Sequence, residues 1–237
     1  MEDNFRSAIR FNEGINFSTI MNKVFSKMFI GLFVTAIAAY ITYTSGVYVT
    51  ILSNTFLSIG IAIAEFALVI YLSSRILKMD AMKANFWFYA YAVLNGITMA
   101  YIFAMFRSQT IFLAFACSAA MFGITALYGY ITKKDLSTVG SVGLMLLVGV
   151  IITTLLNTFL FKSVGVDLFL LYAGLVIFAG LTAYDMQQIK QITAMVDEGQ
   201  KDLAECVSIM GALTIYMDFI NIFIRLLSIF GRNDDNQ

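Results

Sequence analysis

Three acidic residues, Glu65, Asp185 and Asp218, lie inside stretches of sequence that are otherwise apolar. A carboxylate at the centre of a lipid bilayer costs about 2.5 kcal/mol or more. Such a group therefore usually faces the protein interior or a water-filled path, and it is a functional candidate by default. If this chain carries chemistry, we expect it at these three carboxyl groups.

The apolar stretches that hold these acids predict membrane-spanning helices. Of the 237 residues 60% are hydrophobic and 13% are charged, whereas a soluble domain is about half apolar and a quarter charged. A helix of each stretch can cross about 30 Å of hydrocarbon, the shortest with help from flanking residues, and the period-two pattern of barrel strands is missing. We predict seven spans: Met28–Thr44, Phe56–Ser74, Phe86–Phe106, Thr110–Thr132, Thr138–Phe161, Leu168–Tyr184 and Val207–Phe230.

The predicted fold is all-α, a polytopic membrane protein with one domain. Residues 1–27 form a cytoplasmic N-terminal segment, residues 28–230 the seven-helix transmembrane domain and residues 231–237 a polar C-terminal tail. Short connections predict antiparallel neighbours. The exception is Met186–Cys206, whose charged residues predict a solvated cytoplasmic loop that is helical in part.

The basic residues predict the orientation of the spans. Of the 15 Lys and Arg residues, eleven fall in the N-terminal segment and alternate connections, and four fall on the other side. Cytoplasmic connections carry the excess of Lys and Arg. We therefore expect a cytoplasmic N-terminus and an outer C-terminus, although a re-entrant seventh segment would return the C-terminus to the cytoplasm.

This orientation brings the acids to a similar depth. Glu65 falls near the middle of the second span, Arg75 at its cytoplasmic end, and Asp185 near the cytoplasmic end of the sixth. Asp218 falls about eleven residues into the seventh span, roughly 16 Å along a helix. One shared polar site in the cytoplasmic half of the bundle is the prediction.

The seventh span carries further polar residues. Asp218, Asn221 and Arg225 have the spacing i, i+3, i+7 and so share one helical face. A helix with that face does not belong at the lipid boundary, and we expect it to be central.

The chemistry of such a site is acid–base and cation chemistry. Two carboxylates close together and away from water cannot easily both be ionised, so Asp185 and Asp218 would share a proton. Arg75 would compete by pairing with either of them. Carboxylate oxygens also suit Ca²⁺, which makes Glu65 a residue of an ion path and the two aspartates candidate calcium ligands. Two simpler readings stay open: Asp185 lies at the membrane interface, and Arg75 only fixes topology with its head group in water.

Composition excludes other classes. The chain has no histidine and no proline, so imidazole ligation of haem or copper and a histidine relay are excluded. The two cysteines, Cys117 and Cys206, are too few for a disulfide framework. The net charge is zero, which gives no sign of a nucleic-acid partner. We expect no cofactor, with calcium as a permeant or regulatory ion, and no enzymatic activity.

Two segments carry a family resemblance. Leu181–Ile189, LTAYDMQQI, and Gly211–Gly231, GALTIYMDFINIFIRLLSIFG, resemble the Bax inhibitor-1 family, the transmembrane Bax inhibitor motif proteins, and especially its bacterial members. The likeness extends over all seven spans, and Ala64–Phe66 and Arg75 fit it as well. It implies six helices around a central seventh and a pH-sensitive calcium leak.

The resemblance also implies roles for individual residues. Asp185 and Asp218 match the proton-sharing aspartate pair of the family. Arg75 is the candidate for an arginine that latches onto the seventh-helix aspartate in the closed state, and Glu65 matches an implicated second-helix glutamate. A multi-pass protein of a bacterial inner membrane follows, with the lipid bilayer, calcium and protons as partners.

Three other functions are alternatives to a calcium leak. An intramembrane aspartyl protease is disfavoured, because its Pro-Ala-Leu element is impossible without proline and Asp218 lacks a glycine-rich context. A proton-coupled carrier shares the intramembrane carboxylates. A non-transporting regulator that binds a membrane protease or another membrane protein is left open too.

Overall fold

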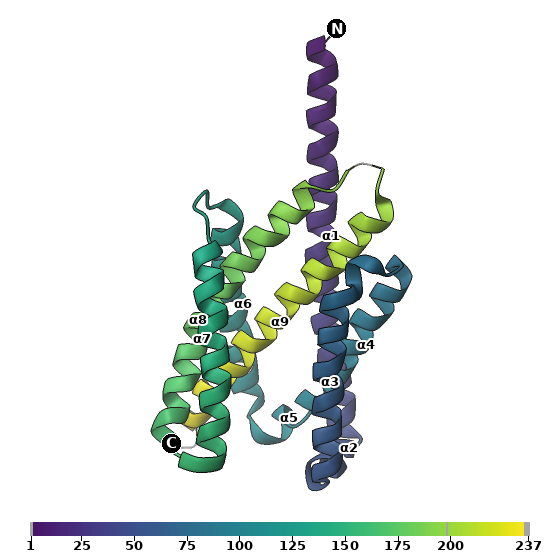
Figure 1. The fold of residues 1–237 in the computed structure, drawn as a ribbon. Helices are drawn as coiled ribbons and strands as arrows, with labels where there is room; N and C mark the ends of the chain where they lie inside the picture. Colours follow the sequence, from purple (N-terminus) through teal and green to yellow (C-terminus); the bar gives the residue numbers. More distant parts are fainter. Residues whose placement is uncertain (1, 198, 235–237) are drawn as a thin grey trace. The chain divides into compact units, whose positions relative to one another are not determined.

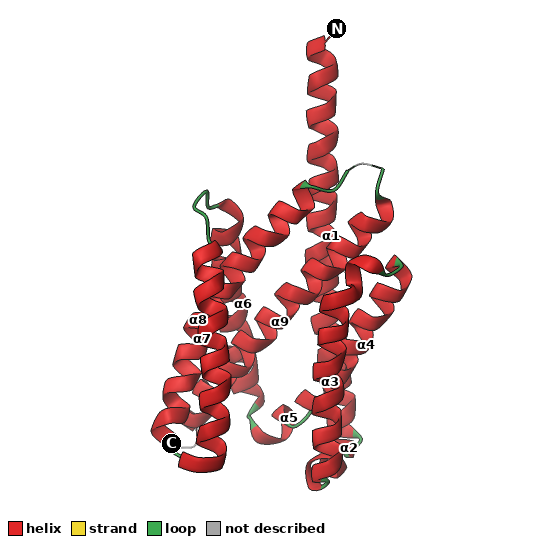
Figure 2. Ribbon diagram, in the orientation of Figure 1, coloured by secondary structure: helices red, strands yellow, loops and turns green. Residues whose placement is uncertain are grey.

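The computed structural model describes residues 2–197 and 199–234, with the backbone alone at residues 2–16, 233 and 234. The described part of the chain is helical and contains no strand (Figure 2), which confirms the all-α prediction. In chain order (Figure 1) the elements are α1 (Glu2–Thr44), α2 (Val47–Ser53), α3 (Thr55–Arg75), the short 3-10 helix η1 (Ile76–Lys78), α4 (Ala81–Met99), α5 (Ile102–Met105), α6 (Ser108–Ile131), α7 (Ser137–Leu156), the π-helical turn η2 (Asn157–Phe161), α8 (Val164–Ala194) and α9 (Lys201–Asp234).

Seven stretches of the described chain are long and apolar enough to cross a membrane, so the predicted number is confirmed. They are Phe17–Thr44, Thr55–Lys78, Ala81–Met105, Ser108–Ile131, Ser137–Phe161, Val164–Ala194 and Lys201–Arg232. At both ends the helices pass the expected limits of the transmembrane domain: α1 is unbroken across residue 28, and α9 continues to Asp234. Residue 1 and residues 235–237 of the expected terminal segments lie outside the described residues.

The segment Met186–Cys206, predicted as a loop that is helical in part, is helical over most of its length. Helix α8 continues to Ala194 and α9 begins at Lys201, so the connection is limited to residues 195–200. The hydrophobic pattern of the sequence ends where the chain leaves the hydrocarbon. The helix itself can continue into water, because its backbone hydrogen bonds are internal. Asp185 consequently lies inside helix α8 rather than at a helix end.

The described contacts divide the chain into two compact units. The first unit comprises residues up to Met105 together with Ile189–Tyr216, and the second comprises Phe106–Gln188 together with residues from Met217 on. In the first unit α1 packs on α4, where Gly96 lies so close to the Thr35 backbone that no Cβ would fit.

In the second unit, glycines of α6 and α7 let α8 approach closely. Gly129 of α6 abuts the backbone of Ala183, and Gly140 and Gly143 of α7 face the side chains of Tyr184 and Leu181. These contacts fix the turn of α8 that immediately precedes Asp185.

Burial distinguishes α9 from the other spans. In its most apolar stretch 72% of the residues are buried, whereas the other six spans have values from 6% to 44%. The central position of the C-terminal helix among the other spans stays a prediction.

Candidate functional site

The second unit brings two of the predicted acids together. Asp185 of α8 and Asp218 of α9 lie within hydrogen-bonding reach of each other. Asp218 is 5% exposed, and its Oδ2 atom is buried with no hydrogen-bond partner among the described residues. Asp185 is half-buried. Two carboxyl groups on different helices thus meet away from bulk water.

A threonine completes the environment of the pair. Thr182, one turn before Asp185 on α8, lies fully buried and within hydrogen-bonding reach of the Asp218 carboxyl group. Its hydroxyl also donates to the Phe178 carbonyl oxygen at 2.7 Å. On the other side of Asp218, the Phe219 ring packs edge-on against Phe122 of α6. The pair therefore has one neutral hydroxyl beside it and an apolar surround.

Such a pair can bind a proton or help to bind a cation. With one proton, the two carboxyl groups form a single hydrogen bond; without it, two negative charges face each other in a poorly solvated place. No group of three or more Cys, Asp or Glu side chains in the described chain could hold a metal ion. The aspartates would therefore supply two carboxylates to a calcium ion, and the remaining ligands would be neutral oxygens or water.

The third acid, Glu65, belongs to the first unit and has neutral partners. It is half-buried on α3. The Asn95 Nδ2 atom of α4 donates to its Oε1 atom at 2.5 Å, and the Thr98 hydroxyl is a second hydrogen-bond partner. Because Glu65 and the aspartates belong to different units, a site shared by all three stays a prediction.

The sequence does not single out Asn95, the partner of Glu65 on α4. It is a neutral amide in an apolar span, so it does not stand out as the acids do. Tyr91, Asn95 and Thr98 have the spacing i, i+4, i+7 that places them on one face of α4. This row of polar residues in an apolar span is the feature of the sequence that could have indicated Asn95.

Arg75 is the last residue of α3 and its side chain is exposed. It belongs to the first unit, whereas Asp218 belongs to the second. The latch between them therefore stays a prediction.

The polar face of α9 continues from Asp218 to Arg225. The Arg225 Nη1 atom donates to the Leu170 carbonyl oxygen of α8 at 3.2 Å, and its guanidinium carbon lies 5.1 Å from the centre of the Phe178 ring. Gly174 leaves the space that the guanidinium group fills. Asn221, between them, donates to the Met217 carbonyl of its own helix.

Two acids in the connections between spans behave as ordinary surface groups. The Lys83 side chain, through a hydrogen bond and its charge, holds the pKa of Asp80 below its usual value. The hydroxyl and then the backbone N–H of Ser137 donate to Asp135 and lower the pKa of that carboxyl group. Both acids are exposed to solvent, whereas Asp218 is buried.

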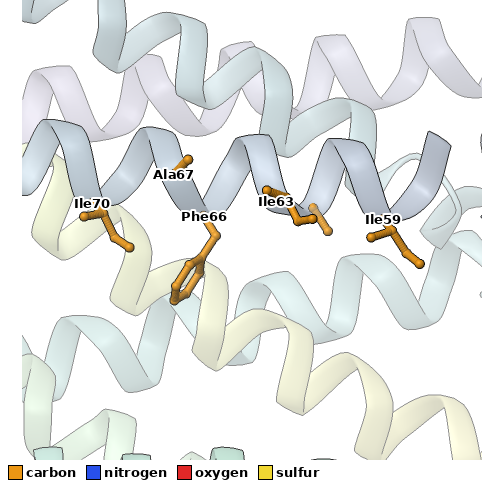
Figure 3. A pocket seen from close by; sticks show the side chains of 6 residues that line it. Ile59, Ile63, Phe66, Ala67 and Ile70 are labelled. Atoms are coloured by element: carbon orange, nitrogen blue, oxygen red, sulfur yellow. The ribbon is translucent and has the colours of Figure 1, made fainter. Parts of the chain in front are cut away.

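A shallow hollow on α3 is purely apolar. Ile59, Ile63, Phe66 and Ile70 project from one side of the helix (Figure 3), and Ala62 and Ala67 complete the lining. Without a polar atom this surface suits contact with lipid chains and not an ion.

Comparison with known proteins identifies the family. A family profile described as Inhibitor of apoptosis-promoting Bax1 matches residues 18–235. Inner membrane protein YbhL of Escherichia coli strain K12 is 40% identical over 214 residues, which cover 90% of this chain and 91% of the relative. The chain belongs to the Bax inhibitor-1 family. Other family relatives include a Deinococcus radiodurans protein, 36% identical over 91% of each chain, and a Streptococcus pyogenes membrane protein, 32% identical over 90% of this chain and 92% of its own.

The residues that match the Bax inhibitor-1 family profile include the whole candidate site. The matched range contains all seven spans from residue 18 on and includes Glu65, Arg75, Asp185 and Asp218. As a member of this family, the chain is a multi-pass helical membrane protein.

Proposed function

We propose that this protein is a pH-sensitive calcium leak channel gated by a proton that Asp185 and Asp218 share. The single observation that supports the proposal best is the position of the two carboxyl groups, within hydrogen-bonding reach on neighbouring helices, with Asp218 almost fully buried. A pair of this kind changes its charge by losing one proton, and its helices respond directly.

The gating follows from electrostatics. With one proton, the hydrogen bond between the carboxyl groups holds α8 and α9 together. When the pH rises and that proton leaves, two negative charges a few ångströms apart repel strongly, because the surroundings screen them poorly. The helices then loosen and calcium passes. Acidification restores the proton and closes the path.

Two further residues have roles in this scheme. Glu65 provides a negative charge along the ion path, and its Oε1 atom accepts a hydrogen bond from Asn95. Arg75 competes with the proton by pairing with Asp218 in the closed state. Calcium contacts the two aspartates in passing and is not a resident cofactor.

We place the protein in a bacterial inner membrane with its N-terminus in the cytoplasm. The names of relatives such as the inner membrane protein of Escherichia coli support the membrane, and the distribution of basic residues supports the orientation. The lipid bilayer is its solvent, and membrane-protein partners stay open.

Calcium flux into proteoliposomes tests the proposal. The purified protein is reconstituted around a calcium-sensitive dye, and passive influx is followed over a series of pH values for the wild type, Asp185→Asn, Asp218→Asn and the double variant. Thr125→Val is the control, because among the described residues the Thr125 hydroxyl bonds to carbonyl groups of its own helix alone.

We expect pH-dependent influx in the wild type and the control, and a flux that no longer responds to pH in the three aspartate variants. Influx that is independent of pH, or that keeps its pH response without both aspartates, would discard the mechanism. Saturable uptake coupled to a proton gradient would establish a carrier instead. Absence of flux together with an intact cellular phenotype in Asp218→Asn would establish a non-transporting regulator.

A further inference from the structure

Asn95 is buried in the first unit with an unused oxygen. It is 7% exposed on α4, and its Nδ2 atom points at Glu65. The Oδ1 atom of the same amide is buried and finds no hydrogen-bond partner in the part of the chain that the structure describes. A buried carbonyl oxygen without a donor costs free energy. A ligand that binds this oxygen beside Glu65 would offset that cost.

Further oxygens lie around this amide. The Thr98 hydroxyl is within hydrogen-bonding reach of Glu65 and donates to the backbone carbonyl oxygen of Asn95 at 2.8 Å. The Tyr91 hydroxyl is within hydrogen-bonding reach of the Asn95 side chain, and Tyr91 is 6% exposed. One carboxyl group of α3 thus lies beside one amide and two hydroxyl groups of α4.

We propose that Glu65, Asn95, Thr98 and Tyr91 form a transit site at which a calcium ion is held during permeation, with Asn95 Oδ1 as a direct ligand. This rests on the proposed function and adds to it a site in the first unit and three residues without an assigned role. In the empty site the amide donates to Glu65. When calcium arrives, the amide turns over and presents Oδ1 to the ion.

The composition of the site fits passage rather than storage. Tight calcium sites surround the ion with several carboxylates and six to eight oxygens. Here a single carboxylate is accompanied by neutral oxygens, and water must supply the rest. Conduction requires binding that is strong enough for entry and weak enough for release, and a site with one negative charge meets both needs.

The test measures binding and selectivity separately. Equilibrium binding of radioactive calcium to the purified protein in detergent is compared for the wild type, Asn95→Leu, Asn95→Asp and Glu65→Gln. The same proteins are then reconstituted, and the ratio of calcium influx to sodium influx is measured. Thr125→Val again serves as the control.

We expect Asn95→Leu to bind calcium roughly tenfold more weakly, since a contact to a charged species is lost, and to lower the calcium-to-sodium ratio. Asn95→Asp adds a second carboxylate, so it should bind calcium roughly tenfold more tightly and release it more slowly. Because Asn95→Asp is close in size to the native residue, it keeps the test valid if Asn95→Leu misfolds.

The two proposals fail in different ways. Binding and selectivity unchanged in Asn95→Asp and in a folded Asn95→Leu, with wild-type flux that responds to pH, would overturn the transit site and leave the aspartate gate standing. Altered binding in these variants, with wild-type flux that ignores pH, would retain the site and remove the gate.

Discussion

Glu65 and Asp218 are both acids within spans, but they face opposite kinds of neighbour. Glu65 on α3 meets the amide and hydroxyl groups of α4, which are neutral. Asp218 on α9 meets the carboxyl group of Asp185 and a single hydroxyl, that of Thr182. Neutral donors solvate a negative charge and allow it to persist, whereas a second acid requires a proton or a cation. On the proposed function, an acid within a span thus serves as a fixed charge in the first unit and as part of a switch in the second.

The largest effect on calcium influx is expected when one aspartate of the Asp185–Asp218 pair is replaced, so that a single acid is left. On the proposed function, Asp218→Asn keeps a side chain of the same shape but leaves Asp185 without a carboxyl partner. The change in calcium influx between about pH 6 and about pH 8 should fall from roughly tenfold to less than twofold, since one shared proton no longer exists to be lost. A dye-based flux assay across that pH range gives the answer, and a response equal to that of the wild type would contradict the scheme.

Removal of the negative charge of Glu65 should have a different effect. Glu65→Gln retains hydrogen bonding to Asn95 but has no charge to attract cations. Calcium influx should drop about tenfold at every pH while its pH response persists, because a charge on an ion path acts on entry and not on the gate. Loss of the pH response in this variant would abolish the distinction drawn between the two acids.

The position of the aspartate pair can be tested through α6. A Cβ at Gly129 would collide with the Ala183 backbone, two residues before Asp185, whereas Gly123 of the same helix has open space. Gly129→Ala should lower the free energy of unfolding by about 1–3 kcal/mol. Gly123→Ala should be neutral or stabilising by up to about 1 kcal/mol. Thermal unfolding in detergent compares them, and equal melting temperatures would show that α8 is not held by this contact.

The smallest effect concerns an acid with positive partners. Glu205, near the start of α9, forms ion pairs of 2.8 Å with both Lys23 and Lys27 of α1. Glu205→Gln should cost about 0.5–1 kcal/mol of stability, and less at high salt, because the pairs are partly exposed. Asp80→Asn, at a fully exposed pair with Lys83, is the control and should leave the melting temperature unchanged. A cost at Glu205 that high salt does not reduce would argue against an ionic origin.

Much of the architecture could be predicted from the sequence, because hydrophobicity alone determines which stretches enter a bilayer. The number of spans and the acids inside them follow from that single property. The extent of the helices does not: the charged residues after Asp185 predict a loop, although α8 continues to Ala194. Water stabilises a polar loop and a polar helix alike, so polarity does not separate them.

The candidate site was predictable only where it carries charge. Asp185 and Asp218 stand out because ionisable groups in spans are rare. Asn95 does not, since one amide in an apolar stretch is compatible with ordinary packing. Asn95 is distinguished by its burial and by its hydrogen bond to the Glu65 carboxyl group, and both depend on how α3 and α4 pack. The contact of Gly129 with Ala183 is likewise invisible in sequence, where Gly123 looks the same.

Asp218 lies close to the middle of the span Lys201–Arg232, and this has an electrical consequence. An elementary charge that crosses a whole membrane changes its energy by about 2.3 kcal/mol per 100 mV, so a proton that reaches the middle experiences roughly half of that. Occupancy of the aspartate pair by a proton would therefore depend on the voltage across the membrane as well as on the pH. A calcium ion, with two charges, would respond about twice as steeply.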